Sequence, residues 1–146
     1  MAAELSPLSL QEAQLMRLLA GMFGADNVVA QMSVRAICGD NFTEEELRIL
    51  PSGERWPREA VCLFTILDRN SDSRLVAELL MTDDAQTVDI ALLEREKFAR
   101  QLFENRGIHY VVFTLKEIAL LVDPDEELDL CRLLEAKLED SSFRIR

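Results

Sequence analysis

One glutamate in an apolar run is the residue most able to do chemistry. The stretch LVAELLMTD, from Leu75 to Asp83, carries Glu78 among aliphatic side chains. A short apolar run of this kind is typical of a buried β-strand. A carboxylate there is costly unless a cation, a metal ion or hydrogen-bond donors accompany it. Glu78 is therefore a working metal ligand, the remnant of a metal site, or a structural charge paired with an arginine such as Arg17 or Arg95.

The elements that must position Glu78 follow from periodicity and from capping and turn residues. Two strand-like runs flank the turn sequence RNSDS and predict a hairpin. A helix of about 19 residues then precedes another strand, a length suited to a crossover to a parallel strand. In chain order we expect helix 10–23, strand 27–34, a short helix 43–49, strands 60–68 and 74–82, helix 88–106, strand 108–114, and helices 115–121 and 123–139.

This order, α-β-(α)-β-β-α-β-α-α, predicts an α/β fold. We expect a three-layer α/β/α arrangement with a mixed sheet of about four strands and helices on both faces. At 146 residues, we expect a single domain, 1–146, with its core in 8–139 and a frayed tail, 140–146.

Composition narrows the classes of function. The formal net charge of −11 disfavours nucleic acid without excluding it, and favours basic protein partners. No apolar run approaches the ~20 residues of a membrane helix, so we expect no membrane partner. The N-terminus lacks the basic region of a secretory signal, which predicts a cytoplasmic protein. The widely spaced Cys38, Cys62 and Cys131 predict reduced thiols.

The hairpin register predicts the surroundings of Glu78. Counting back from the turn places Glu78 across from Leu63 or Phe64. On its own strand, the neighbours on the same face are Val76 and Leu80. Leu63, Val76 and Leu80 would make these surroundings apolar, which favours a structural or residual role. Glu12 has a structural interpretation of its own, because it lies three residues after Ser9 in a capping-box pattern.

Two stretches carry a resemblance to a known family. They are PLSLQEAQLMRLLAGMFGADNVVAQMSV and REKFARQLFENRGIHYVVF, the latter with a Gly-Ile that ends a helix and opens a strand. With the order of elements, they resemble the PD-(D/E)XK nuclease superfamily, which has the restriction-endonuclease-like fold, over most of the chain from Leu8 to Phe113. The resemblance implies that fold and a site at the central hairpin.

The chain departs from the family at the catalytic positions. The resemblance places the family's hairpin Asp at Leu63, its Glu at Glu78 and its following Lys or Asp at Leu80. The acids that remain at site positions are Glu78, Glu12 and Glu96. Metal-assisted phosphodiester hydrolysis needs clustered oxygen ligands and a group that orients water. Leu63 and Leu80 supply neither.

We therefore expect a catalytically degenerate PD-(D/E)XK-like domain that acts through contact with a protein partner or as a homodimer, without a cofactor. One alternative is a metal-dependent nuclease with migrated carboxylates, in which Glu78 binds Mg²⁺ or Mn²⁺ together with Glu12, Glu96 or Asp83. The other is an acidic inhibitor that mimics DNA.

Overall fold

The computed structural model describes residues 8–50, 53–80, 90–121 and 126–139. Its main sheet has four strands in the spatial order β1-β4-β5-β6. The β1/β4 and β4/β5 pairs are antiparallel, and β6 returns parallel to β5. The predicted mixed sheet, hairpin and parallel return are thus confirmed, with these bounds: β1 Val28–Ser33, β4 Val61–Leu67, β5 Ser73–Leu80 and β6 His109–Thr114.

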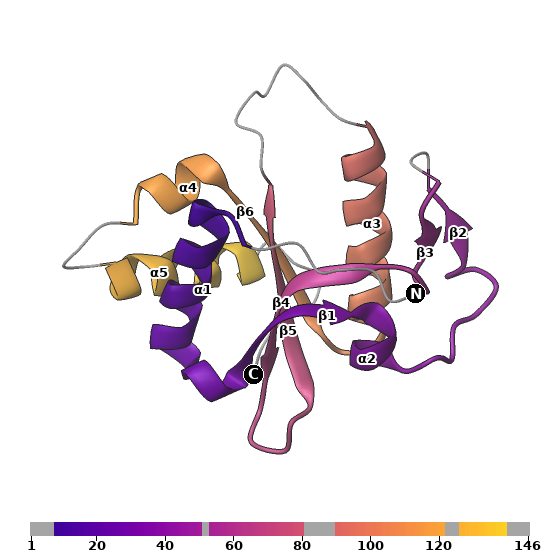
Figure 1. Ribbon diagram of the computed structural model, residues 1–146, viewed down its shortest axis with the longest axis horizontal. Helices are drawn as coiled ribbons and strands as arrows, with labels where there is room; N and C mark the ends of the chain where they lie inside the picture. Colours follow the sequence, from indigo (N-terminus) through magenta and orange to yellow (C-terminus); the bar gives the residue numbers. More distant parts are fainter. Residues whose placement is uncertain (1–7, 51–52, 81–89, 122–125, 140–146) are drawn as a thin grey trace.

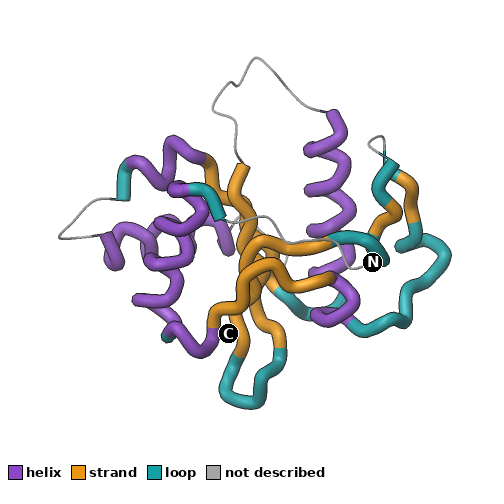
Figure 2. Tube along the Cα trace, viewed as in Figure 1, coloured by secondary structure: helices purple, strands orange, loops and turns teal. Residues whose placement is uncertain are grey.

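Helices cover both faces of this sheet, as expected (Figure 1). On one face lie α1 (Leu10–Phe23), α4 (Leu115–Ala119) and α5 (Glu126–Glu139). On the other lies α3 (Ile90–Asn105), beside a small hairpin of β2 (Arg48–Ile49) and β3 (Arg55–Trp56). The short helix α2 (Val34–Cys38) follows β1 directly. Figure 2 shows the strands between these two layers of helix.

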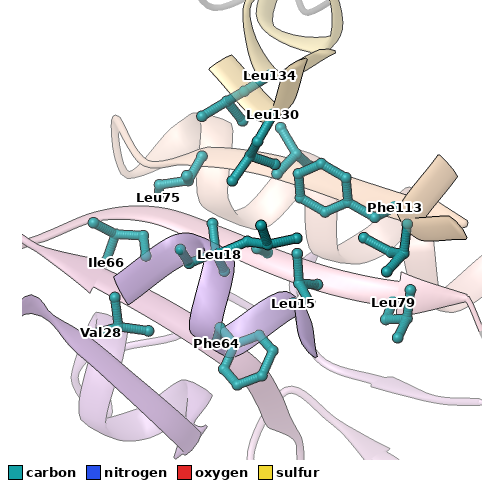
Figure 3. Close-up of a cluster of buried hydrophobic side chains, with 14 of the residues drawn as sticks. Leu15, Leu18, Val28, Phe64, Ile66, Leu75, Leu79, Phe113, Leu130 and Leu134 are labelled. Carbon is teal, nitrogen blue, oxygen red and sulfur yellow. The ribbon is translucent and has the colours of Figure 1, made fainter. Parts of the chain in front are cut away.

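The face under α1, α4 and α5 carries the larger apolar cluster (Figure 3). Phe64, Leu75 and Phe113 rise from the strands to meet leucines of α1 and α5, and Phe64 and Phe113 have no exposed surface. The labelled members are Leu15, Leu18, Val28, Phe64, Ile66, Leu75, Leu79, Phe113, Leu130 and Leu134. Burial of this apolar surface is the main favourable term in the folding of this half.

The face under α3 has a separate cluster. Trp56 from β3, Val76 from β5 and Phe103 from α3 are all buried there. The rings of Phe103 and Tyr110 stack with their centroids 5.7 Å apart, which joins α3 to β6. Glu78 follows Val76 by two residues on β5, so its side chain points into this α3-facing half.

Local signals set the helix ends. The predicted capping box at α1 is confirmed: Ser9 Oγ accepts from the Glu12 N–H, and Glu12 Oε1 accepts from the Ser9 N–H at 2.8 Å. After α3, Gly107 has a φ of 73°, a left-handed conformation that suits glycine at a helix stop. A second capping box, between Thr114 and Glu117, starts α4 and was not anticipated.

The predicted short helix at 43–49 is wrong. Thr43 and Glu46 do exchange the hydrogen bonds of a capping box, but the chain makes a single turn and then enters β2. The Glu46 carboxylate is also bound by a residue distant in the sequence, because Arg106 donates to both of its oxygens, at 2.7 and 2.9 Å. A helix nucleus is costly, and pairing with β3 supplies the competing hydrogen bonds. The helix between β1 and β4 is instead α2.

Some predictions fall on residues that the structure does not describe: the end of strand 74–82, the start of helix 88–106, the start of the last helix at 123–125 and the tail at 140–146. Within the described residues, no helix has the length and apolarity required to cross a membrane.

The first testable prediction concerns Arg106, which fastens the 41–46 segment to the end of α3. Its guanidinium also donates to the Asn41 carbonyl oxygen at 3.0 Å. We expect Arg106→Ala to lower the free energy of unfolding by about 1–2 kcal/mol, because several charge-assisted hydrogen bonds are lost at a partly exposed site. Urea unfolding measures this loss, and hydrogen exchange should accelerate at the amides of 41–47.

Arg132→Ala, on the exposed surface of α5, is the matched control and should change stability by less than about 0.5 kcal/mol. The Arg106 hydrogen bonds lower the pKa of Glu46 below its ordinary value of 4.5. This stabilisation is therefore present above pH 4.5 and is lost as pH falls through the folded-state pKa. Equal losses in Arg106→Ala and Arg132→Ala would contradict this role for Arg106.

Candidate functional site

Glu78 is held by donors from its own chain. Its Oε1 accepts a hydrogen bond from the Leu63 N–H at 3.1 Å, and its Oε2 lies 3.7 Å from Nη1 of Arg95. The buried thiol of Cys62 lies near the carboxylate and lowers its pKa slightly. The Glu78 side chain is 18% exposed, so these contacts replace most of its hydration. Of the two predicted arginine partners, the structure selects Arg95.

The expected apolar surroundings of Glu78 are only partly correct, because β4 is irregular at Leu63. Cys62 packs in the α3-facing cluster, whereas Phe64 packs in the opposite one. Regular alternation would place both on the same face. The Leu63 side chain packs against the far cluster, and only its N–H reaches Glu78. Between the β1 partners of Cys62 and Phe64, Gln31 has a φ of 55°, so the neighbouring strand is also distorted here.

Arg95 joins α3 to the start of β4, to β5 and to the β2–β3 hairpin. Its Nη2 donates to the Val61 carbonyl oxygen at 2.9 Å, and its Nε lies 3.7 Å from Oε1 of Glu54. The guanidinium carbon lies 5.4 Å from the centroid of the Trp56 ring, within the range of a cation–π contact. Since the Arg95 side chain is only 19% exposed, these contacts together compensate the burial of its charge.

Burial and pairing act in opposite directions on the acidity of Glu78. Burial raises the pKa of the Glu78 carboxyl above its ordinary value of 4.5, and the Arg95 charge, the Leu63 N–H and the Cys62 thiol offset only part of that rise. Burial, reinforced by the Glu78 charge, raises the pKa of the Cys62 thiol well above 9.0. Cys62 therefore stays protonated at neutral pH. It is a buried, protonated thiol and not a nucleophile.

A shallow depression of about 60 Å³ opens beside Glu78. Glu96 of α3 lines it with Glu78, together with Leu80, Tyr110 and Val112. Glu96 is 37% exposed and pairs with Arg100 at 3.2 Å, one helical turn along α3. The structure thus brings two of the predicted acids, Glu78 and Glu96, to one concavity. Both already have cationic partners there.

The remaining predicted acids lie elsewhere. Glu12 caps α1, which packs on the opposite face of the sheet from Glu78 and α3. Asp83 falls outside the described residues. Across the described part of the chain, no three His, Cys, Asp or Glu residues gather in a way that could hold a metal ion.

Comparison with known proteins adds no relative. No family model matches the chain, and the searches of curated proteins and of solved structures return no match either. The candidate site is therefore interpreted from its own geometry.

Sequence reasoning missed two features of the site. The hydrogen bond from the Leu63 N–H and the position of Cys62 in the α3-facing cluster depend on the break in alternation at Leu63, which leaves no signal in the run AVCLFTILD. The contact between Arg95 and Trp56 joins residues far apart in the chain, and the stretch LPSGERWPRE carries no periodicity that would place Trp56 against α3.

The second prediction concerns the titration of Glu78. Because its folded-state pKa is raised, the folded protein binds this proton more tightly than the unfolded chain does. The contribution of Glu78 to stability is therefore greatest below pH 4.5 and declines as pH rises towards the folded-state pKa. We expect the free energy of unfolding of the wild type, minus that of Glu78→Gln, to fall with pH across this window.

Urea unfolding at closely spaced pH values measures this difference, and carbon-detected NMR of the Glu78 carboxyl gives the pKa directly. Subtracting the two free energies of unfolding cancels the pH dependence of carboxylates that both proteins share. One of these is Asp68, whose pKa is lowered by Arg74. A Glu78 pKa at or below 4.5, with a difference that rises or stays flat, would show that pairing outweighs burial.

Proposed function

We propose that this chain is a catalytically degenerate PD-(D/E)XK-like domain that acts through protein contact and not through phosphodiester hydrolysis. The observation that carries this proposal is the engagement of Glu78. Both of its carboxylate oxygens face donors of the same chain, Leu63 N–H and Arg95.

A hydrolytic site needs carboxylate oxygens that are free to bind a divalent cation. At Glu78 a guanidinium lies 3.7 Å from Oε2 and contributes the positive charge that a metal would otherwise bring. The positions that the family resemblance assigns to further ligands are Leu63 and Leu80, whose side chains offer no oxygen. Glu78 is thus suited to fastening α3 to the sheet, and this supports a structural use of the ancestral site.

Protein contact is the mode of action that the charge favours. The net charge of −11 repels phosphate backbones and attracts basic protein surfaces. The leucines of the last helix that the structure describes pack on the sheet and do not form a dimer surface: Leu130 and Leu134 are buried in the core, and Leu133 and Leu138 pack against it. A homodimer stays among the partners that this proposal covers.

The alternative function is a metal-dependent nuclease with migrated ligands. One observation favours it: Glu96 lines the same depression as Glu78. For both carboxylates to bind Mg²⁺ or Mn²⁺, Arg95 and Arg100 would have to release them, and each guanidinium would lose a carboxylate partner. This cost makes the nuclease the second candidate.

The third prediction separates these two functions. We expect calorimetric titration with Mn²⁺ to give no saturable heat with the wild type, Glu78→Gln or Glu96→Gln. Incubation of supercoiled plasmid with each protein and Mn²⁺ should give no cleavage above the buffer control. Light scattering over a range of protein concentrations should then identify a homodimer or direct the search to other partners.

Saturable Mn²⁺ binding by the wild type that is lost in both variants, together with plasmid cleavage that is lost in parallel, would overturn the proposal and establish the nuclease. Binding that persists in both variants without cleavage would locate a metal away from this depression and leave the proposal standing.

A further inference from the structure

A concavity larger than the depression at Glu78 lies away from it, between the 43–48 segment and α3. Its volume of about 390 Å³ falls in the range of small-molecule pockets, roughly 300–1,000 Å³. Phe98, Gln101, Leu102 and Asn105 line one wall, and their i, i+3, i+4 and i+7 spacing places them on one face of α3. Trp56 lines the groove and is buried, so it contributes to the floor.

The wall opposite α3 is fixed in place. Arg106 donates to both carboxylate oxygens of Glu46 and to the Asn41 carbonyl oxygen. The Glu46 carboxylate also accepts a hydrogen bond from the Thr43 N–H, which closes the turn at 43–46. A wall held by this many charge-assisted hydrogen bonds keeps the groove open without a ligand, which lowers the conformational cost of binding. The groove is thus a built feature of the fold.

Arg48 supplies the distinctive chemistry of the groove. Its guanidinium carbon lies 5.2 Å from the centroid of the Phe98 ring, and the residue is exposed. Within the described residues, its side chain makes this cation–π contact and no ion pair with a carboxylate, so its N–H groups are available to a ligand. Arg106, by contrast, already forms an ion pair with Glu46. A guanidinium in contact with an aromatic ring can still bind a planar anion through its N–H fork.

Two amide side chains and an apolar floor complete the lining. Gln101 and Asn105 lie one helical turn apart and can each donate and accept hydrogen bonds. Phe98, Leu102 and Trp56 offer flat or aliphatic surface beneath them. A ligand that satisfies all of these groups has a carboxylate for Arg48, polar atoms for the amides and a flat apolar body for the floor.

We propose that this groove binds a small carboxylic acid with a flat apolar body, such as an aromatic acid. The net charge of −11 weakens attraction for any anion, but charges beyond the Debye length of about 8 Å at physiological salt are screened. Of the two acids in the lining, Glu46 is paired with Arg106, and Glu45 is exposed, so its charge is screened by solvent. The proposal stands apart from the function proposed above, since neither Glu78 nor Glu96 lines the groove.

The fourth prediction uses Trp56 as the reporter, because it is the one tryptophan in the sequence. Titration with phenylacetate should change its fluorescence saturably and shift its indole N–H signal in NMR. Phenylacetamide, of the same shape without the charge, should bind at least about tenfold more weakly, because a charge-assisted fork is lost. Arg48→Gln should weaken phenylacetate binding by a similar factor.

Arg55→Gln is the matched control: it removes an exposed arginine of the adjacent strand that does not line the groove, and it should leave binding unchanged. No saturable response to phenylacetate would overturn the proposal, as would equal binding of acid and amide, or unchanged binding in Arg48→Gln. An acetylated peptide ending in phenylalanine is the last arm. If it binds at least tenfold more tightly than phenylacetate, the groove takes a protein terminus and the small-acid assignment is wrong.

Discussion

A guanidinium confined between a helix and a sheet is the constraint on which the α3-facing half of this protein depends. Arginine does not lose its charge in a protein interior, so every N–H of Arg95 removed from water needs a replacement partner. The chain supplies Glu78 from β5, Glu54 beside β3 and the Val61 carbonyl from β4, and Trp56 covers the guanidinium. These contacts fix α3 over three separate strands, and the Phe103–Tyr110 stack then closes the other end.

The same constraint explains why an acid is tolerated within β5. Burial alone would leave the Glu78 carboxyl protonated or unstable, and its raised pKa records that tendency. The distortion of β4 at Leu63 turns one main-chain N–H towards the carboxylate. The Glu78–Arg95 pair is thus stabilised by contacts within the fold. We therefore give Glu78 a structural role and look for function at other surfaces.

Much of the fold follows from the sequence because its signals are local. The Ser9–Glu12 box, the turn RNSDS and the helix-length interval before His109 fix α1, the hairpin and the parallel return. The prediction of a helix at 43–49 was wrong although its capping box is present. The Glu46 side chain is also bound by Arg106, sixty residues further along the chain, and this tertiary contact cannot be seen in the local sequence. The surroundings of Glu78 depend on a strand irregularity and on Trp56, and both arise from tertiary packing that periodicity does not encode.

The central claim is that Glu78 and Arg95 stabilise the fold as a pair, and a double-mutant cycle tests it most directly. Urea unfolding of the wild type, Glu78→Gln, Arg95→Gln and the double variant gives the coupling free energy, with Glu96 and Arg100 as a control cycle on the surface of α3. We predict a coupling of about 1–3 kcal/mol for the buried pair and about 0.3–0.5 kcal/mol for the control. Additive effects of the two substitutions, within about 0.3 kcal/mol, would contradict the claim. Glu78 would then again be a candidate metal ligand or catalytic residue.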